Sequence, residues 1–221
     1  MQQKLKVIIT GATGMVGEGV LHVSLSHPDV EQVLIINRKP SGLQHPKLKE
    51  ILHDNFYDLS AIENQLPGYD ACFFCLGVSS VGKSKDDYYK TTYTLTMHVA
   101  QTLSKLNPGM TFCYISGAGT SEKSRQNWAR VKAKTETDLS KFPFKHVFGL
   151  RPGFIKPAKD QKRILSFYKY ISWLFPFGRK VFPGAFCTME ELGLCMIHLA
   201  QKGFEKKIIE GKDIIRIAAL S

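Results

Sequence analysis

Short, almost purely apolar runs alternate along the chain with longer segments in which apolar residues recur every three or four positions. The short runs have the length and the β-branched content of buried strands, and they span residues 5–10, 32–37, 70–76, 110–116 and 144–150. The clearest helical segments between them are 86–105 and 125–140. Strands without polar alternation are typical of a parallel sheet covered by helices on both faces. The pattern therefore predicts an α/β fold built on an open, doubly wound parallel sheet.

Weaker patterns extend this prediction toward the C-terminus. A strand is expected near residues 48–53, a helix at 189–201 and a last strand at 214–217. Thr188 and Glu191 have the spacing of a capping box, which marks the start of that helix. A chain of 221 residues fits one domain, 1–221. Because prolines, lysines and aromatic residues become more frequent after Arg151, we expect residues 153–221 to contribute a small cap on the substrate side.

A glycine-rich segment follows the first predicted strand and precedes a helix-compatible stretch. Its three glycines recur at every third position. Between a strand and a helix, such glycines allow a tight turn, a close approach of the backbone to a pyrophosphate, and close packing of helix on strand, while the free N–H groups of the helix receive the anion. The segment predicts a Rossmann fold that binds a nicotinamide dinucleotide through Gly11, Thr13, Gly14, Met15, Val16 and Gly17.

The end of the second predicted strand indicates which dinucleotide is bound. About 20 residues after the glycine turn, NAD-binding proteins usually carry an Asp or Glu for the ribose hydroxyls, whereas this chain has Asn37 and Arg38. A guanidinium can pair with a 2′-phosphate, so Arg38 favours NADP over NAD. Asp54, after the third predicted strand, is expected to accept a hydrogen bond from the adenine amine, with a plain turn or capping role as the alternative.

In these features the chain resembles the short-chain dehydrogenase/reductase superfamily, in the extended and atypical branches that include nucleotide-sugar epimerases and Tat-interacting-protein-like oxidoreductases. The resemblance covers most of the chain and rests on Lys132 and the segments 10–17, 37–38, 75–77, 116–119 and 151–153. It implies that Leu76 and Gly77 contact the cofactor. It also implies that Ser116 orients a substrate carbonyl or hydroxyl and that Lys132 holds the cofactor ribose. The proton-exchanging tyrosine of the superfamily stands four residues before this lysine, where the chain has Trp128.

Trp128 departs from the superfamily pattern at the position that exchanges the proton. An indole N–H donates a hydrogen bond but does not exchange a proton near neutral pH, so Trp128 can shape or close the site without acting as general acid or base. A proton would then come from Lys132, from Ser116 through water, or from a tyrosine elsewhere. The candidate tyrosines are Tyr88, Tyr89, Tyr168 and Tyr170.

Two functions stay open on this basis. The first is an NADP(H)-dependent oxidoreductase or epimerase-like enzyme that acts on a small-molecule carbonyl or secondary alcohol, with Ser116, Lys132 and Trp128 at its catalytic centre. The second is a non-catalytic sensor or interaction protein that keeps the dinucleotide as a ligand and has lost proton transfer. The glycine turn supports both equally, because a fold alone does not determine an activity.

The net charge indicates which partners to expect, and the cysteines indicate in which compartment the protein lies. The net charge of +11 favours anionic partners, but the cations are spread along the whole chain and no nucleic-acid-binding motif occurs, so no nucleic acid is expected. The five cysteines lie mostly in apolar runs, and Cys72 and Cys75 face opposite ways on a strand, so we expect reduced thiols and no metal site. With no secretory leader pattern, the expected location is the cytoplasm.

Residues 163–182 concentrate aromatic side chains between cationic ends. Three interpretations of this segment stay open: a helix that packs on the domain, an apolar lid over a hydrophobic substrate, and an amphipathic helix that lies on an anionic membrane. The last of these would make the protein a peripheral membrane protein. The sequence does not determine the oligomeric state.

Overall fold

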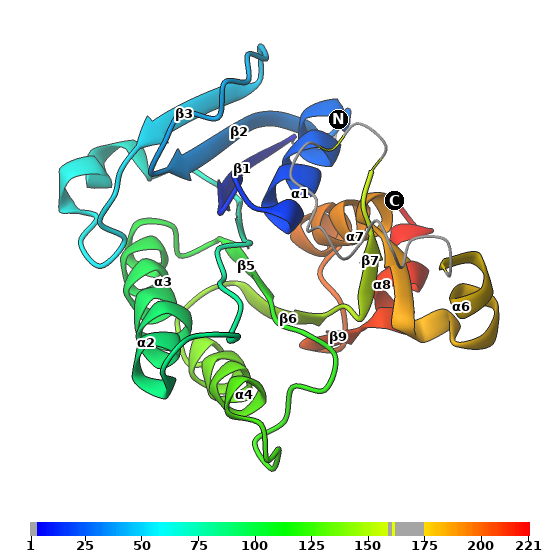
Figure 1. The fold of residues 1–221 in the computed structure, drawn as a ribbon. Helices are drawn as coiled ribbons and strands as arrows, with labels where there is room; N and C mark the ends of the chain where they lie inside the picture. Colours follow the sequence, from blue (N-terminus) through cyan, green and yellow to red (C-terminus); the bar gives the residue numbers. More distant parts are fainter. Residues whose placement is uncertain (1–3, 159–160, 162–174) are drawn as a thin grey trace.

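A parallel sheet forms the centre of the computed structural model, which describes residues 4–158, 161 and 175–221. The strands are β1 (Leu5–Thr10), β2 (Val30–Asn37), β3 (Leu48–Leu52), β4 (Ala71–Phe74), β5 (Thr111–Ile115), β6 (His146–Arg151) and β9 (Ile208–Glu210). They lie in the order β3-β2-β1-β4-β5-β6-β9, and every neighbouring pair is parallel (Figure 1). The strand order reverses between β1 and β4. The predicted doubly wound α/β fold is confirmed.

Helices cover both faces of this sheet (Figure 1). One face carries α1 (Met15–Ser26), α7 (Met189–Lys202) and α8 (Gly211–Ala218). The other face carries α3 (Leu95–Leu106) and α4 (Asn127–Leu139). The shorter elements are η1 (Ser60–Gln65), α2 (Lys85–Tyr89), η2 (Lys90–Thr94), β7 (Phe154–Lys156), α6 (Phe175–Val181), η4 (Pro183–Ala185) and β8 (Phe186–Thr188).

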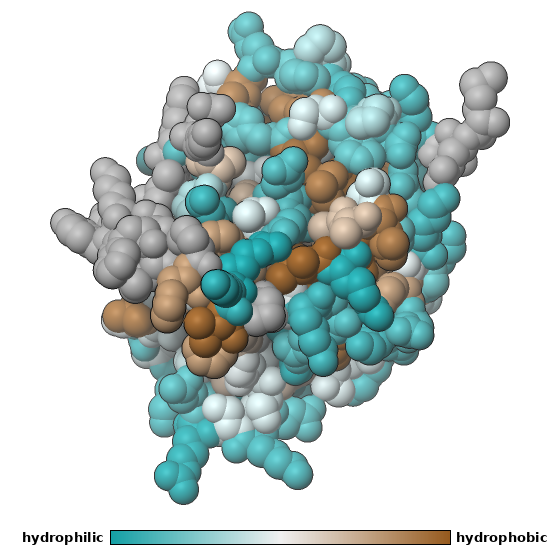
Figure 2. Space-filling view, turned by 90° about the vertical axis from the view of Figure 1, so that its right-hand side faces the viewer, coloured by the Kyte–Doolittle hydropathy of each residue, from teal (hydrophilic) through white to brown (hydrophobic). Residues whose placement is uncertain are grey.

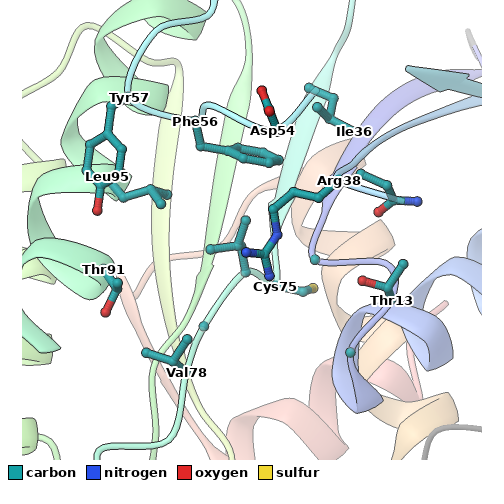
Figure 3. Close-up of a pocket in the computed structure, with 15 residues that line it drawn as sticks. Thr13, Ile36, Arg38, Asp54, Phe56, Tyr57, Cys75, Val78, Thr91 and Leu95 are labelled. Carbon is teal, nitrogen blue, oxygen red and sulfur yellow. The ribbon is translucent and has the colours of Figure 1, made fainter. Parts of the chain in front are cut away.

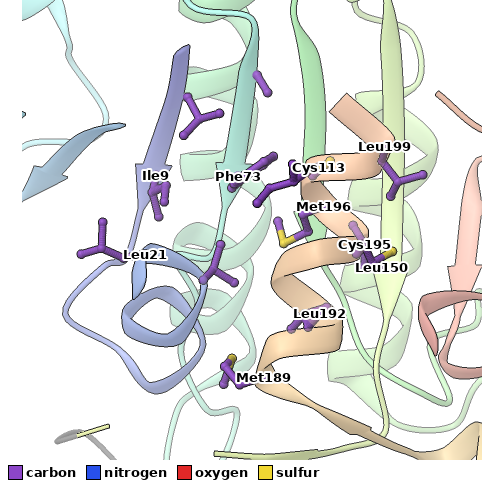
Figure 4. Packing of buried hydrophobic residues seen from close by; sticks show 14 of the residues in the cluster. Ile9, Leu21, Phe73, Cys113, Leu150, Met189, Leu192, Cys195, Met196 and Leu199 are labelled. Atoms are coloured by element: carbon purple, nitrogen blue, oxygen red, sulfur yellow. The ribbon is translucent and has the colours of Figure 1, made fainter. Parts of the chain in front are cut away.

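Residues of one strand alternate between two cores, because successive side chains point to opposite faces of a pleated strand. In β1, Val7 and Ile9 belong to the core beneath α1 and α7, while Ile8 belongs to the core beneath α3. Figure 4 shows Leu192 and Met196 of α7 among the strand residues of the first core. Both faces of the central strands are therefore buried, which explains why the sequence shows no polar alternation in them.

The predicted helices are confirmed, one of them with an irregularity. The segment predicted at 86–105 consists of α2, the π-helical turn η2 and α3 in direct succession. Such turns insert an extra residue into a helix and occur frequently at functional sites. The segment predicted at 125–140 is α4, and α7 begins with the predicted capping box, in which Thr188 and Glu191 each accept the backbone N–H of the other.

The prediction of a last strand at 214–217 is wrong. These residues lie in α8, where Ile214, Ile217 and Ala218 are buried and α8 packs against α7. The β-branched isoleucines favoured a strand, but the buried positions recur at three and four residues, which is the helical spacing. The seventh strand is instead β9, whose three residues are too few to produce a recognisable pattern. A second small sheet, in which β7 pairs with β8, escaped prediction for the same reason.

Most of the aromatic segment 163–182 lies outside the described residues, since its placement is described only from residue 175 onward. In α6, Phe175 is buried against the rings of Phe154 and Phe186. Phe177 in α6 and Phe182 directly after this helix are exposed. Figure 2 shows apolar residues interrupting the hydrophilic surface on this side of the molecule. Within the described part of the chain, no helix has both the length and the apolar character needed to cross a membrane.

Candidate functional site

A pocket of about 390 Å³ opens where the strand order reverses, beyond the carboxyl ends of β1, β2 and β4 (Figure 3). Ligands of open α/β sheets bind in such a crevice, because the loops on its two sides diverge to opposite faces of the sheet. The predicted cofactor-binding residues that line it are Gly11, Thr13, Gly14, Asn37, Arg38, Asp54, Leu76 and Gly77. The structure therefore brings the glycine turn and the ends of three strands into one site.

Glycines give the turn after β1 a shape that other residues do not permit. Gly11 has a φ of +71°, and a Cβ atom there would lie 2.7 Å from the backbone nitrogen of Leu76. A Cβ atom at Gly17 would lie 2.1 Å from the carbonyl oxygen of Gly11, so α1 starts in direct contact with the end of the strand. Gly14 is the N-cap of α1 and donates its N–H to the Gly11 carbonyl oxygen at 2.9 Å. The N–H groups of the first helical turn have no partners within the helix and can receive an anion.

Met15, Val16 and Gly17 were predicted to bind the cofactor, but they are not among the residues that line the pocket. They form the first turn of α1, where the side chains of Met15 and Val16 pack against the core. Their side chains are therefore occupied by packing. Any contribution of these three residues to anion binding comes from their backbone N–H groups.

Asn37 and Arg38 leave β2 at the side of the pocket with different exposure. Asn37 is buried, and its Nδ2 donates to Oε1 of Glu50 on β3 at 2.8 Å. Arg38 is exposed, and Figure 3 shows its guanidinium extending into the pocket. The carboxylate of Asp54 points away from this guanidinium, with the ring of Phe56 between them (Figure 3). The pocket therefore presents a cationic group on this side.

The remaining wall of the pocket is formed by residues that were not among the predicted site residues: Ile36, Phe56, Tyr57, Cys75, Val78, Thr91 and Leu95. Phe56 and Tyr57 come from the loop after β3, where no periodic pattern exists to be read. Thr91 and Leu95 are four residues apart on one helical segment, and this spacing places them on the same face. That spacing was a readable signal, and the π-helical turn at Lys90–Thr94 lies at this point of the wall.

Ser116 and Lys132 meet at the end of β5, outside the set of residues that line the pocket. Ser116 is buried, and its hydroxyl lies 3.0 Å from that of Thr120. Lys132 on α4 donates Nζ to the carbonyl oxygens of Ile115 and Ser116, both at 3.1 Å. Burial lowers the pKa of Lys132 to about 8, against a smaller opposing effect of the Glu136 carboxylate. The amine therefore remains mostly protonated at pH 7.

Trp128 lies one helical turn before Lys132 and borders the loop after β5. A Cβ atom at Gly117 or at Gly119 would lie 3.8 Å from the six-membered ring of the indole. The indole Nε1 donates to Oε1 of Gln126 at 2.5 Å. The indole N–H is therefore already used within the chain, and the ring borders the loop that follows Ser116.

Two of the four tyrosines considered as proton sources, Tyr168 and Tyr170, lie outside the described residues. Tyr88 is buried, and burial raises its pKa. Because a raised pKa holds the phenol proton more tightly, Tyr88 is a poorer proton donor than an ordinary tyrosine. Tyr89 stacks on Tyr93 with ring centroids 4.7 Å apart.

Glu136 and Arg151 connect α4 to β6. Two hydrogen bonds join them, from Nη2 to Oε2 at 2.6 Å and from Nε to Oε1 at 3.1 Å, and Nη1 of Arg151 also contacts Glu210 at 3.2 Å. The side chains of Glu136 and Arg151 are only 5% and 19% exposed, so water screens this pair little. The pair fixes the helix that carries Lys132 against the strands.

The glycine turn, the crevice beyond the strand ends and the basic side of the pocket define a Rossmann protein that binds a nicotinamide dinucleotide. The chain belongs to the NAD dependent epimerase/dehydratase family, whose model matches residues 7–144. The matched region includes the whole pocket, Ser116 and Lys132. The resemblance to the short-chain dehydrogenase/reductase superfamily is thereby confirmed.

The similarity of this chain to several known proteins extends over nearly its whole length. The Saccharomyces cerevisiae protein named "Protein FMP52, mitochondrial" is 26% identical over 227 aligned positions, which cover 96% of both chains. A short chain dehydrogenase family protein from Francisella tularensis superposes with a TM-score of 0.68 at 16% identity, covering 95% of this chain and 98% of that one. The Bordetella bronchiseptica enzyme WbmH, solved in complex with NAD+, has a TM-score of 0.63 at 18% identity and covers 90% of this chain and 72% of its own. At these identities the two structures support the fold alone.

The expectation of a cytoplasmic location is wrong. Curated relatives from Saccharomyces cerevisiae, Aspergillus terreus and Candida albicans all carry "mitochondrial" in their names. The expectation rested on reduced cysteines and on the lack of a secretory leader pattern. Neither feature distinguishes the cytoplasm from an organelle.

Proposed function

We propose that the protein binds NADP(H) and is an oxidoreductase or epimerase-like enzyme that acts on a carbonyl or secondary alcohol. The observation that carries the proposal is the arrangement of the pocket: the tip of α1 faces it from one side, and the guanidinium of Arg38 extends into it from another. A helix tip suits the pyrophosphate bridge of a dinucleotide, and a guanidinium suits a 2′-phosphate. NAD has no such phosphate, so Arg38 favours NADP(H).

The residues around the pocket fit such a cofactor. The backbone at Gly11 and Gly14 would hold the pyrophosphate, Arg38 the 2′-phosphate, and Leu76 and Gly77 would lie along the cofactor toward Ser116. A bound NADP(H) would supply or accept a hydride. The aromatic and aliphatic residues opposite Arg38 would exclude water from the adenine side.

Ser116, Lys132 and Trp128 would then divide the work on the substrate. The Ser116 hydroxyl, held by Thr120, would orient the substrate oxygen. The protonated amine of Lys132 would hold a ribose hydroxyl and, with its pKa of about 8, could release a proton to the substrate oxygen near neutral pH. The Trp128 ring borders the loop after Ser116 and would form an apolar wall there.

A second candidate is a sensor or interaction protein that binds the dinucleotide without hydride transfer. One observation favours it: both hydrogen bonds of the Lys132 amine go to backbone carbonyls, at 3.1 Å each, as in a residue that supports the fold. The missing tyrosine points the same way. This candidate predicts NADP(H) binding that is independent of any turnover.

Two measurements decide between these candidates. Calorimetric titration of the protein with NADP+ and NAD+ should give tighter binding of NADP+, and Arg38→Ala should remove most of this preference. NADPH oxidation is then followed with a panel of aldehydes, ketones and nucleotide sugars, with Lys132→Ala as the comparison. Turnover that Lys132→Ala abolishes supports the enzyme, whereas tight binding without turnover across the panel supports the sensor. Absence of binding at millimolar cofactor overturns both.

We further propose a mitochondrial location, in line with the names of the relatives, and contact with an anionic membrane through the region of α6. The exposed Phe177, Val181 and Phe182 beside Lys180, together with the net charge of +11, support such contact. The protein should sediment with vesicles containing anionic phospholipid, and salt should weaken this. Fractionation of the source cells tests the location, and recovery in the cytosolic fraction alone would contradict it.

A further inference from the structure

The carboxylate of Glu50, which is not among the predicted site residues, lies next to Asn37 at the basic side of the pocket. The register between β2 and β3 pairs Ile35 with Glu50 and Asn37 with Leu52. Ile35 belongs to the core beneath α1 and α7, and Ile51 to the opposite core, so the pleat puts Asn37 and Glu50 on the face that α1 covers. The second strand lacks the acidic residue that NAD-binding proteins carry, but the neighbouring strand supplies one beside the same position.

Glu50 fixes the orientation of the Asn37 side-chain amide. Its Oε1 accepts hydrogen bonds from Asn37 Nδ2 and from the backbone N–H of Ser41, both at 2.8 Å. A carboxylate accepts hydrogen bonds and does not donate them, so only the NH₂ end of the amide can face Glu50. The carbonyl end of Asn37 must therefore face the other way.

The Asn37 Oδ1 atom that results is a buried acceptor without a donor. Asn37 is 3% exposed and lines the pocket, and within the described residues its Oδ1 accepts no hydrogen bond. A buried acceptor that is left unpaired destabilises the folded chain, because it has lost its hydrogen bonds to water. Buried polar atoms of folded proteins are nearly always hydrogen-bonded. The Asn37 Oδ1 atom therefore points to a ligand that supplies a hydrogen-bond donor.

We propose that Glu50 is a positioning residue that presents Asn37 Oδ1 to a hydroxyl of the adenosine ribose. This inference rests on the proposed dinucleotide binding. The acceptor requires an N–H or O–H donor; a phosphate ester ionised at neutral pH offers neither, whereas a ribose hydroxyl does. Arg38 and Asn37 therefore recognise different groups of NADP(H): the guanidinium binds the 2′-phosphate, and the amide oxygen binds the 3′-hydroxyl, which is the free hydroxyl of the same sugar.

Calorimetric titrations with ADP, 2′-deoxy-ADP and 3′-deoxy-ADP test this assignment. In the unmodified protein, removing the recognised hydroxyl should weaken binding about tenfold, the value of one hydrogen bond. In Glu50→Ala the amide is free to turn, so the ADP and deoxy-ADP affinities should agree within about twofold, as in a double-mutant cycle between residue and ligand group. Glu31→Gln serves as the matched control, because Glu31 is an exposed carboxylate on β2 that pairs with Lys6; it should behave like the unmodified protein.

Glu50→Gln separates positioning from charge. The Gln oxygen can accept from Ser41 and Asn37 as the carboxylate does, so hydroxyl discrimination should persist. If Glu50 acted only through its charge, Glu50→Gln and Glu50→Ala would both change the ratio of 2′,5′-ADP to ADP affinity and leave hydroxyl discrimination intact. Should Glu50→Ala unfold, Glu50→Val keeps the strand propensity and removes the acceptor.

The results distinguish this inference from the proposed function. Equal affinity of the unmodified protein for ADP and 3′-deoxy-ADP overturns the role of Asn37, whatever the affinity for 2′-deoxy-ADP. Hydroxyl discrimination that survives in Glu50→Ala overturns the role of Glu50, while dinucleotide binding still stands. If neither ADP nor NADP+ binds at millimolar concentration, the proposed function fails and the inference fails with it.

Discussion

Replacing Lys132 with methionine should remove a pH-dependent part of the protein's stability. The pKa of Lys132 is lowered from 10.5 to about 8 because the amine is buried. Well below pH 8 the amine carries its proton in both the folded and the unfolded chain, so it does not make the free energy of unfolding depend on pH. Between pH 8 and 10.5 the unfolded chain binds a proton that the folded chain has released, so the free energy of unfolding rises with pH. From pH 7 to pH 9.5 these values give a rise of about 2 kcal/mol.

The assay compares the free energy of unfolding of the unmodified protein and Lys132→Met at pH 7, 8 and 9.5. For a chain of this size, about 2 kcal/mol corresponds to roughly 4–8 °C in Tm. Buried thiols such as Cys113 and Cys195 have raised pKa values and destabilise the fold over the same range, since the unfolded thiols ionise first. Both proteins contain them, so the difference between the proteins isolates Lys132.

The prediction specifies the sign of the stability difference between Lys132→Met and the unmodified protein. Lys132→Met should be more stable than the unmodified protein at pH 7, where burial penalises the charged amine, and this advantage should shrink as the pH rises. Lys123→Met, which changes an exposed lysine in the loop before α4, should follow the profile of the unmodified protein. A difference between the unmodified protein and Lys132→Met that stays constant from pH 7 to 9.5 would refute the lowered pKa.

Three further predictions concern the turn, the ion pair and the indole. Gly11→Ala should weaken NADP+ binding at least tenfold in calorimetry, because φ is +71° and the added methyl group would meet backbone atoms. Gly68 has a φ of +83° but open space around it, so the control Gly68→Ala should lose stability and keep its affinity for NADP+. Glu136→Gln should lower the free energy of unfolding in urea by about 3 kcal/mol, since it removes the buried carboxylate charge and leaves Arg151 only the more distant and more exposed Glu210 as a charged partner. A loss below about 1 kcal/mol would contradict the role of this pair. If the protein is an enzyme, Trp128→Tyr should raise NADPH-dependent turnover about a hundredfold by restoring a proton donor, and an unchanged rate would mean that position 128 does not face the substrate.

The parts of the fold that the sequence predicted are those encoded by local patterns. Strands β1 to β6, the capping box at Thr188 and the turn at Gly11 each depend on neighbouring residues, and their signals are present in single windows of sequence. The failure at 214–217 arose where two local preferences conflict: isoleucine favours strands, while the spacing of the buried residues favours a helix. Packing against α7 decides that conflict, and packing is not visible in the window.

The candidate site was predictable only where it follows strand ends. Gly11, Arg38 and Gly77 each directly follow or lie near the end of a strand, so topology alone brings them together. Phe56 reaches the pocket from an irregular loop, which carries no periodic signal. The position of Glu50 beside Asn37 follows from the register between β2 and β3, which pairs residues 15 positions apart. Local sequence carries no signal for this register.

The reversal of strand order between β1 and β4 has a consequence for how this protein can change over evolutionary time. The crevice exists because the chain leaves adjacent strands toward opposite faces, so its presence does not depend on the side chains that border it. Substitutions at its rim can therefore alter which ligand is accepted while the cavity itself persists. A scaffold of this kind can change a residue beside the crevice, such as the one at position 128, and keep its capacity to hold a ligand.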